Sequence, residues 1–211
     1  MARPRQNLLT RQRIIETAAA IVDAEGLEAV TVRRLGTELG VQGPSLYNHF
    51  ATMAEILDEV ADAVVARVDV SFFATHDWRS ALGLWARSYH AALSAHPNIV
   101  PVLAQGPGRR PAALAMADAV YGGLIGAGWP PARATHIGAL MRYLVTGSAL
   151  GSFALGFAED PQLYALYPHL RDAHLLAEHQ HSVDEGAFTL GLDLLIAGLD
   201  RLYASLKGVR A

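Results

Sequence analysis

Apolar residues recur every three or four positions along most of the chain, which is the period of an amphipathic α-helix. We find no convincing strand pattern, so the sequence predicts an all-α fold. After residue 70, helices are expected over about 78–93, 111–126, 132–157 and 185–206. Proline and glycine cluster at 96–111, and the segment 158–170 interrupts the pattern, so both are predicted to be loops with short irregular helices.

Start and stop signals define further helices near the N-terminus. Thr10 precedes an apolar-periodic segment that reaches about residue 25, and Gly26 ends it. Thr52 and Glu55 have the spacing of a capping box, in which both side chains accept hydrogen bonds from backbone N–H groups at a helix start. This pair predicts a helix that leaves the N-terminal region and runs toward the rest of the molecule.

Two predicted helices between these form a helix-turn-helix pair. Thr31 caps the first of them and Gly40 ends it, while Pro44 suits the first turn of the second because its missing N–H would be unpaired there. Gly36 leaves room where the two helices cross. Polar side chains gather on the outer face of the second helix, where a helix can enter the major groove of DNA. The spacing alone leaves a merely solvated face as the alternative.

The amino-acid sequence of this region is similar to that of a known family. Residues 31–50, TVRRLGTELGVQGPSLYNHF, follow AAAIVDAEGLEAV and precede ATMAEILDEV. Together they resemble the DNA-binding module of TetR-family transcriptional regulators. Weaker similarity to the ligand-binding and dimerising domain of the tetracycline-repressor branch continues in DWRSALGLWARSYHAALSAHP, GAGWPPARATHIGALMRYLVTGSALG and GAFTLGLDLLIAGLDRL. The resemblance implies a helix-turn-helix DNA-binding domain over 1–52 and a helical ligand-binding and dimerisation domain over 53–211.

The resemblance also assigns contacts to double-stranded DNA residue by residue. It implies base reading by Arg33, Gln42 and Ser45, apolar contact to thymine by Pro44, phosphate contact by Tyr47 and His49, and either role for Asn48. Arg3, Arg5 and Arg11 would hold the adjacent DNA backbone or reach the minor groove. Gly43 offers no side chain at a reading position, and Met53 replaces a lysine found in many relatives. These two departures leave open an alternative, a small-molecule carrier or sensor that has lost operator binding.

Composition narrows the classes of function. The net charge is −3, so any nucleic-acid surface must be local, and within 1–50 six arginines slightly outnumber five carboxylates. The absence of cysteine excludes a disulfide framework and fits a cytoplasmic protein. Charged residues 11, 13 and 16 interrupt any signal-peptide pattern. No phosphate-binding loop, nucleophile elbow or zinc-protease motif is present, so the sequence predicts a protein that is not an enzyme.

A cavity for a small-molecule effector is predicted among the central helices. Aromatic walls with a few polar groups suit a drug-sized, largely apolar molecule, and the expected lining is Trp85, Tyr89, His90, Tyr121, Thr135, Ala139, Arg142 and Tyr143. Arg142 needs a partner because it lies in a strongly apolar helix. Residues 99–106 lack the histidine with which the tetracycline repressor holds drug-bound magnesium, and His174, His179 and His181 are interpreted as solvated. We therefore predict no metal and no cofactor.

A homodimer that matches a palindromic operator is expected from the last helices. Leucines and a phenylalanine follow a 4-3-4-3-4 spacing at Phe188, Leu192, Leu195, Leu199, Leu202 and Leu206, and glycines that allow close helix approach stand at Gly138, Gly147, Gly151, Gly191 and Gly198. Packing within one subunit is the alternative. The apolar segment 137–157 is long enough for a membrane span, but Arg142 and the acidic flank favour a buried helix and no membrane partner.

Overall fold

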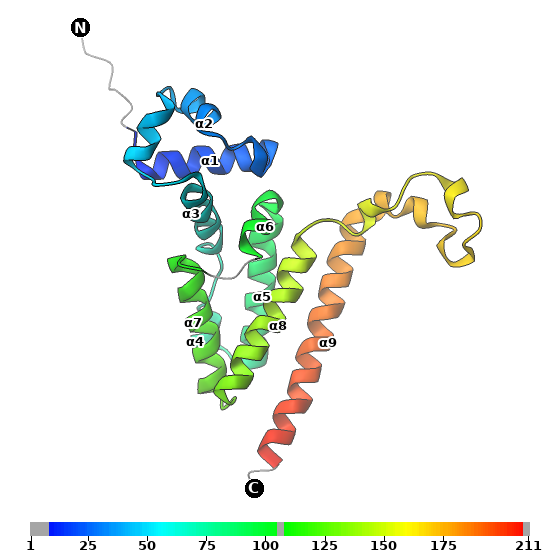
Figure 1. Cartoon of the computed structure of the whole chain (residues 1–211). Helices are drawn as coiled ribbons and strands as arrows, with labels where there is room; N and C mark the ends of the chain where they lie inside the picture. Colours follow the sequence, from blue (N-terminus) through cyan, green and yellow to red (C-terminus); the bar gives the residue numbers. More distant parts are fainter. Residues whose placement is uncertain (1–8, 105–107, 209–211) are drawn as a thin grey trace.

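The computed structural model describes residues 9–104 and 108–208, and its described secondary structure is helical throughout (Figure 1). The α-helices are α1 (Arg11–Glu25), α2 (Val32–Leu39), α3 (Met53–Val65), α4 (Phe72–Thr75), α5 (Trp78–Ser94), α6 (Val100–Leu103), α7 (Pro111–Gly126), α8 (Pro131–Ala149) and α9 (Gln180–Gly208). Short 3₁₀ turns are η1 (Leu27–Ala29), η2 (Gly43–Asn48), η3 (Pro97–Ile99), η4 (Ala154–Gly156), η5 (Pro161–Tyr164), η6 (Pro168–Leu170), η7 (Ala173–Leu175) and η8 (Ala177–His179).

The helices form a small N-terminal module on top of a larger bundle (Figure 1). In the module, α1, α2 and η2 pack together, and α3 leads from them into the bundle. In the bundle, α5 packs against α8 and α9, while α7 packs against α3 and α8. One continuous apolar core runs through both parts, from Ile14 of α1 to Tyr203 of α9.

An aromatic cluster closes the end of the bundle remote from the N-terminal module. The ring centroids of Trp78 and Trp129 lie 5.2 Å apart in an edge-to-face contact, and that of Tyr203 lies 5.1 Å from that of Trp129. The Tyr203 hydroxyl donates a hydrogen bond to the backbone oxygen of Ala127. Because these residues come from α5, α9 and the turn between α7 and α8, the cluster ties three segments together.

The predicted helix starts are confirmed at the N-terminal end. Thr10 caps α1 by accepting a hydrogen bond from the N–H of Arg13, and Thr31 caps α2 in the same way through Arg34. Pro44, however, lies in a 3₁₀ turn, in which the N–H of Ser45 bonds to the oxygen of Gln42 at 2.9 Å. The expected second helix of the pair is therefore tighter and shorter than an α-helix.

Two other helix boundaries were predicted wrongly. The helix expected over 132–157 ends at Ala149, where Gly147 and Gly151 lower helix propensity. The last helix begins at Gln180 rather than near 185 and continues through Gly186, because a long helix that packs against a core tolerates single glycines. No helix in the described parts of the chain combines the length and apolarity needed to cross a bilayer.

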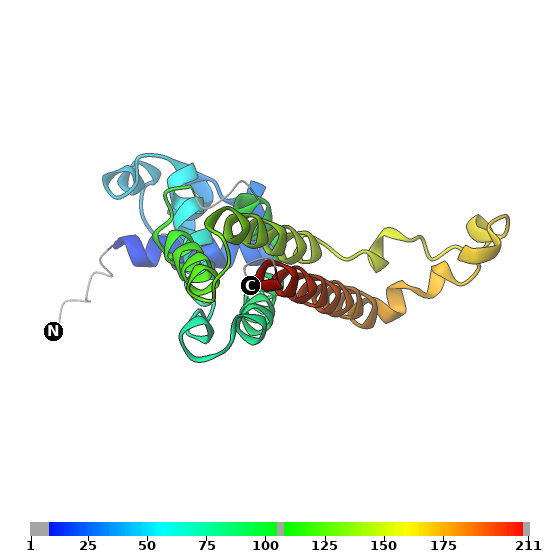
Figure 2. The same ribbon diagram turned by 90° about the horizontal axis from the view of Figure 1, so that it is seen from below.

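Residues 150–179 form an arm that projects away from the bundle between α8 and α9 (Figure 2). The arm contains turns η4 to η8 and no described α-helix. Many of its large apolar side chains are exposed, namely Leu150, Phe153, Leu155, Leu163, Leu166, Tyr167, Leu170 and Leu175. Such a concentration of exposed apolar surface is unusual for a monomer.

Candidate DNA-binding surface and ligand cavity

The helix-turn-helix region is held together by a close backbone crossing. Gly40 adopts a left-handed conformation with φ +70°, which ends α2 and turns the chain toward η2. A Cβ atom on Gly43 would lie 2.6 Å from Cγ1 of Val32, and one on Gly36 would lie 3.0 Å from the oxygen of Val41. The prediction that Gly36 leaves room for the crossing is confirmed, and Gly43 is required by packing. The missing side chain at Gly43 therefore gives no support to a lost DNA-binding function.

The outer face of α2 and η2 presents the polar residues that the sequence singles out. Five of them are exposed, namely Arg33, Gln42, Pro44, Tyr47 and Asn48, while Ser45 and His49 are partly buried. Beneath them, Leu35, Leu46 and Phe50 are buried in the core. The geometry thus brings the predicted DNA-contacting residues onto one surface, which we call the recognition face.

Two arginines of the module are engaged within the protein. Arg34 pairs with Glu25 at 2.7 Å and with Glu38, and it lowers the pKa of the Glu25 carboxyl. Arg11 lies over the Phe50 ring and pairs with Glu59 at 2.7 Å, which ties α1 to α3. The expected role of Arg11 in DNA binding therefore competes with an internal contact. Arg3 and Arg5 lie outside the described residues.

Helix α3 connects the recognition face to the interior of the bundle. At its start, Thr52 accepts a hydrogen bond from the N–H of Glu55 at 3.1 Å, and Glu55 accepts one from the N–H of Ala51 at 2.7 Å. This bond from Ala51, together with Arg11, lowers the pKa of Glu55. At its end, Val65 lines a cavity. The helix predicted from the capping pair thus spans from the DNA-binding module to that cavity.

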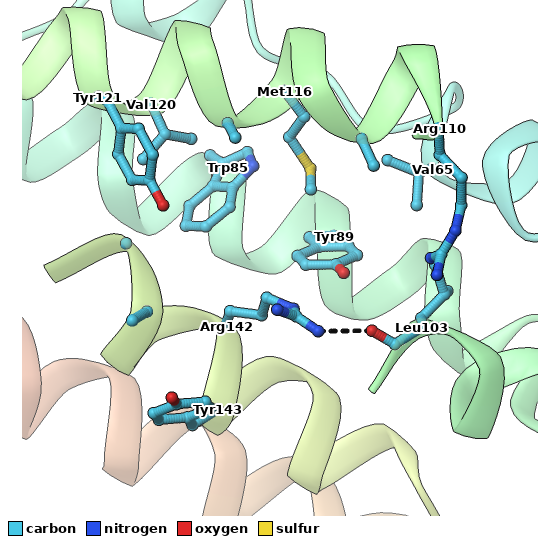
Figure 3. A pocket seen from close by; sticks show the side chains of 14 residues that line it. Val65, Trp85, Tyr89, Leu103, Arg110, Met116, Val120, Tyr121, Arg142 and Tyr143 are labelled. Atoms are coloured by element: carbon cyan, nitrogen blue, oxygen red, sulfur yellow. Dashed lines mark hydrogen bonds between the residues drawn. The ribbon is translucent and has the colours of Figure 1, made fainter. Parts of the chain in front are cut away.

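The cavity lies between α5, α6, α7, α8 and the end of α3, and it has a volume of about 120 Å³ (Figure 3). Six of the eight predicted residues line it, namely Trp85, Tyr89, Tyr121, Ala139, Arg142 and Tyr143. Trp85 and Tyr89 are almost fully buried, and Tyr143 stands at the rim with 69% of its surface exposed. Burial raises the pKa of Tyr89, and the charge of nearby Arg142 partly opposes this shift. The hydroxyl of Tyr89 therefore stays neutral near pH 7.

Two predicted lining residues lie elsewhere. His90 stacks on Phe188 with ring centroids 3.9 Å apart and lies 3.9 Å from the Glu185 carboxylate, so it packs α5 against α9. Burial lowers the pKa of His90, with Glu185 acting in the opposite direction. Thr135 is exposed and donates to the oxygen of Pro131 in its own helix. Both residues sit on other faces of their helices than the sequence pattern suggested.

Two arginines bring charge to the cavity wall. Arg142 donates through Nη2 to the backbone oxygens of Leu103 at 2.6 Å and Ala104 at 2.9 Å, which confirms that it needs a partner (Figure 3). Arg110 is only 8% exposed and precedes α7. Its Nε donates to the Asp58 carboxylate of α3, and its Nη2 donates to the oxygen of Val102 in α6, each at 3.1 Å. Each arginine therefore touches both the cavity and the end of a neighbouring helix.

Sequence reasoning missed the other lining residues. They are Val65, Leu103, Arg110, Ala113, Met116, Ala117, Val120 and Gly138. Most are small apolar residues that do not differ in the sequence from ordinary core positions. Arg110 was detectable as a charge directly before Pro111, the first residue of a strongly apolar helix, where an arginine needs a fixed partner.

The expected dimer residues divide into two groups. Gly138 faces its own cavity, because a Cβ atom there would lie 2.3 Å from Cε1 of Tyr121, and Leu199 is buried in its own core. These two assignments are corrected to intramolecular packing. Gly191 approaches Leu144 within the same chain, and Leu195 and Leu202 also pack partly against the core.

An open apolar face remains on α8 and α9. A Cβ atom on Gly147, Gly151 or Gly198 would meet nothing within 4 Å. Leu190 and Leu194 of α9 are 61% and 62% exposed, and they are four residues apart on one helix face. The 4-3-4-3-4 spacing thus marks the inward face of α9, and the neighbouring face is free to contact a partner.

No group of three histidine, aspartate or glutamate side chains in the described residues is placed to hold a metal ion. His174 bonds locally to the oxygen of Arg171 at 3.1 Å. The histidine cluster at 174–181 therefore forms no joint site among these residues.

A helix-turn-helix module with a polar outer face, joined by one helix to an internal cavity, defines a DNA-binding protein that responds to a small molecule. Two family models match this chain. Residues 14–60 match "Bacterial regulatory proteins, tetR family", and residues 74–203 match "Tetracyclin repressor-like, C-terminal domain". The chain belongs to the tetR family of bacterial regulatory proteins and is a ligand-responsive transcriptional regulator.

Individual relatives agree with this assignment over nearly the whole chain. The tetracycline repressor protein class C of Escherichia coli is 32% identical, with 93% of each chain covered. A possible TetR family transcriptional regulator from Streptomyces coelicolor A3(2) has a similar structure, with a TM-score of 0.76, 28% identity, and coverage of 92% of this chain and 100% of that one. The Streptomyces coelicolor protein ActR in complex with actinorhodin has a TM-score of 0.72 at 29% identity, with coverage of 91% and 97%.

Proposed function

We propose that this regulator represses transcription from a palindromic operator and leaves it when a small, largely apolar molecule occupies the cavity. The observation that supports this most strongly is the path of α3, which begins beside the recognition face and ends at Val65 in the cavity wall. A change in the cavity therefore reaches the DNA-binding module through one rigid element. ActR with actinorhodin and a TetR variant with minocycline are solved relatives that bind small molecules.

The recognition face contacts DNA through residues of separate roles in this proposal. Arg33, Gln42 and Ser45 read base edges in the major groove, with Pro44 against a thymine methyl group. Tyr47 and His49 contact phosphates and position the module without reading sequence, and Asn48 serves either role. We place the DNA-binding domain at 1–52 and the effector-binding and dimerisation domain at 53–211. Gly43 serves the helix crossing in place of a base contact.

The functional unit is a homodimer in this proposal. The open face of α8 and α9 and the apolar arm together supply the surface that a second copy would cover. A two-fold axis between copies would set two recognition faces against two half-sites about 34–36 Å apart. We infer that the protein acts in the cytoplasm, where its DNA is, and that it carries out no catalysis.

A selection experiment tests the proposal. Random duplex DNA is enriched on the protein, and fluorescence anisotropy then measures affinity for the selected sequence and for a scrambled one at two salt concentrations. We expect a palindromic consensus and a specificity that persists at the higher salt. Equal affinity for both sequences would instead indicate a small-molecule carrier or sensor that has lost operator binding.

A further inference from the structure

The charged side chains that line the cavity are all cationic. Its lining includes two arginines and, among the described residues, no aspartate or glutamate. Nη1 of Arg110 is buried and has no hydrogen-bond acceptor within the described part of the protein, and the same holds for Nε1 of Trp85. Buried donors without acceptors are rare in folded proteins because each loses its hydration without replacement. The unfilled hydrogen-bonding capacity of this wall is therefore for an acceptor.

The positive charges of the two arginines are only partly compensated by carboxylates. Asp58 is the carboxylate paired with Arg110, through Nε, and its side chain is 54% exposed, so its charge is shared with solvent. Arg142 donates to two neutral carbonyl oxygens. A cation bonded to neutral carbonyls gains less than one paired with an anion, so a small anion in the cavity would be a better partner.

We propose that the natural effector is an aromatic anion, and that Arg110 and Arg142 bind its carboxylate or acidic phenolate group. This inference rests on the proposed role of the cavity as the effector site and adds the chemical class of the effector. The aromatic part packs against Trp85 and Tyr89, which form the apolar wall on α5 (Figure 3). A cavity of about 150 Å³ holds one benzene ring, so this cavity of about 120 Å³ limits the enclosed part of the effector to about one ring.

The same two arginines connect the anion to the DNA-binding module. Arg142 holds the end of α6 through Leu103 and Ala104, and Arg110 bridges α6 to Asp58 of α3. An anion that binds both guanidinium groups, at Nη1 in the case of Arg110, draws their charge away from these contacts and weakens them. Its binding therefore loosens α6 and α3 together, whereas a neutral ring in the same cavity leaves both arginine bridges intact.

Two probes of nearly equal shape test this inference. Fluorine NMR titrations measure the affinity of 4-fluorobenzoate and of its neutral counterpart 4-fluorobenzamide at about pH 7.5, where the carboxylate is ionised. We expect the wild-type protein to bind the benzoate at least about tenfold more tightly, as a charge-assisted pair predicts. Arg110→Met and Arg142→Met should each remove most of this preference. Arg110→Lys, which keeps the charge, should retain part of it.

Arg87→Met is the matched control, because Arg87 lies on α5 outside the cavity and pairs with Asp193 at 3.6 Å. This substitution also removes one positive charge, and it should leave the preference for 4-fluorobenzoate over 4-fluorobenzamide unchanged. Circular dichroism melting establishes that each variant is folded, and if Arg110→Met is not, the Arg142→Met and Arg110→Lys variants decide. Equal binding of the two probes by the wild type, or a preference that survives in Arg142→Met, overturns the anionic effector but leaves the cavity as the effector site. If neither probe binds, the anionic effector is overturned, and the proposed release from the operator is decided separately by screening neutral aromatic molecules.

Discussion

The recognition face and the cavity both contain arginine, but the arginine of the first is exposed and those of the second are held inside the protein. On the recognition face, Arg33 and Gln42 are exposed and free to meet DNA, while the neighbouring Arg34 is paired with two glutamates. In the cavity, Arg110 is buried and is held by Asp58 of another helix. In the proposed account, the unpaired surface arginine is available to contact DNA, whereas the buried arginine acts as a switch because its partners are limited.

The largest expected effect concerns the open face of α8 and α9, because the proposed dimer places two recognition faces on the operator. Leu190→Asp together with Leu194→Asp places charge on the exposed face of α9, and we expect monomers by light scattering. Loss of the second half-site contact should weaken operator binding by about 100- to 10,000-fold. The control is Leu114→Asp with Ile125→Asp, which changes two exposed apolar residues of α7 in the same way. A variant that stays dimeric would show that the dimer uses another surface.

The next prediction compares the effect on DNA binding of replacing the unpaired Arg33 with that of replacing its paired neighbour Arg34. Arg33→Ala and Gln42→Ala should each weaken specific binding by about 1–3 kcal/mol and relax the preferred sequence at one position. Arg34→Ala should leave the selected consensus unchanged, because Arg34 is engaged with Glu25 and Glu38. Repeated selection on each variant measures the outcome. A changed consensus for Arg34→Ala alone would reverse the assignment.

A third prediction alters the cavity and spares the recognition face. Gly138→Ala places a methyl group where Tyr121 now lies and should push that ring into the cavity. Overpacking of this kind costs about 1–3 kcal/mol, so we expect 4-fluorobenzoate to bind at least about fivefold more weakly while operator affinity is retained. Gly122→Ala on α7 is the control, because a Cβ atom there meets nothing within 4 Å. Unchanged probe binding in Gly138→Ala would place the probe elsewhere.

The smallest effect is a pH dependence at the contact between α5 and α9. Burial against Phe188 lowers the pKa of His90 in the folded protein, so the unfolded chain binds a proton more readily. The stabilising contribution is full above the unfolded pKa of about 6.5 and is lost as the pH falls below it. Urea unfolding at about pH 7.5 and 5.5 should show a larger loss in the wild type than in His90→Gln. An equal loss would mean that His90 titrates normally.

The two regions also differ in how far the sequence predicted them. The caps at Thr10, Thr31 and Thr52 act within one helical turn, so the sequence alone was sufficient to place them. The polar surface of the recognition face follows from the same local geometry. The contraction at Pro44 into a 3₁₀ turn was not predictable, because proline suits the first turn of an α-helix equally well.

The cavity was predicted less completely because five helices and a loop residue build it. Trp85, Tyr89 and Arg142 were identifiable as large or charged residues in apolar helices. Arg110 was detectable as a charge that needs a fixed partner, but its partners Asp58 of α3 and Val102 of α6 were not, because both lie on other helices. The spacing along α9 identified an apolar seam but did not tell whether it faced inward or toward a partner. Burial of Leu192 and Leu199 shows that it faces inward.

The central claim is that the cavity and the recognition face are thermodynamically coupled. The most direct measurement is the affinity of 4-fluorobenzoate for the free protein and for the protein saturated with its selected operator, by fluorine NMR. Thermodynamic linkage requires the two effects to be equal: operator DNA weakens probe binding by the same factor as the probe weakens operator binding. A coupling free energy of about 1–3 kcal/mol corresponds to a factor of about 5–150. We predict such a reduction, matched in the two directions. Equal probe affinity with and without operator would contradict the account.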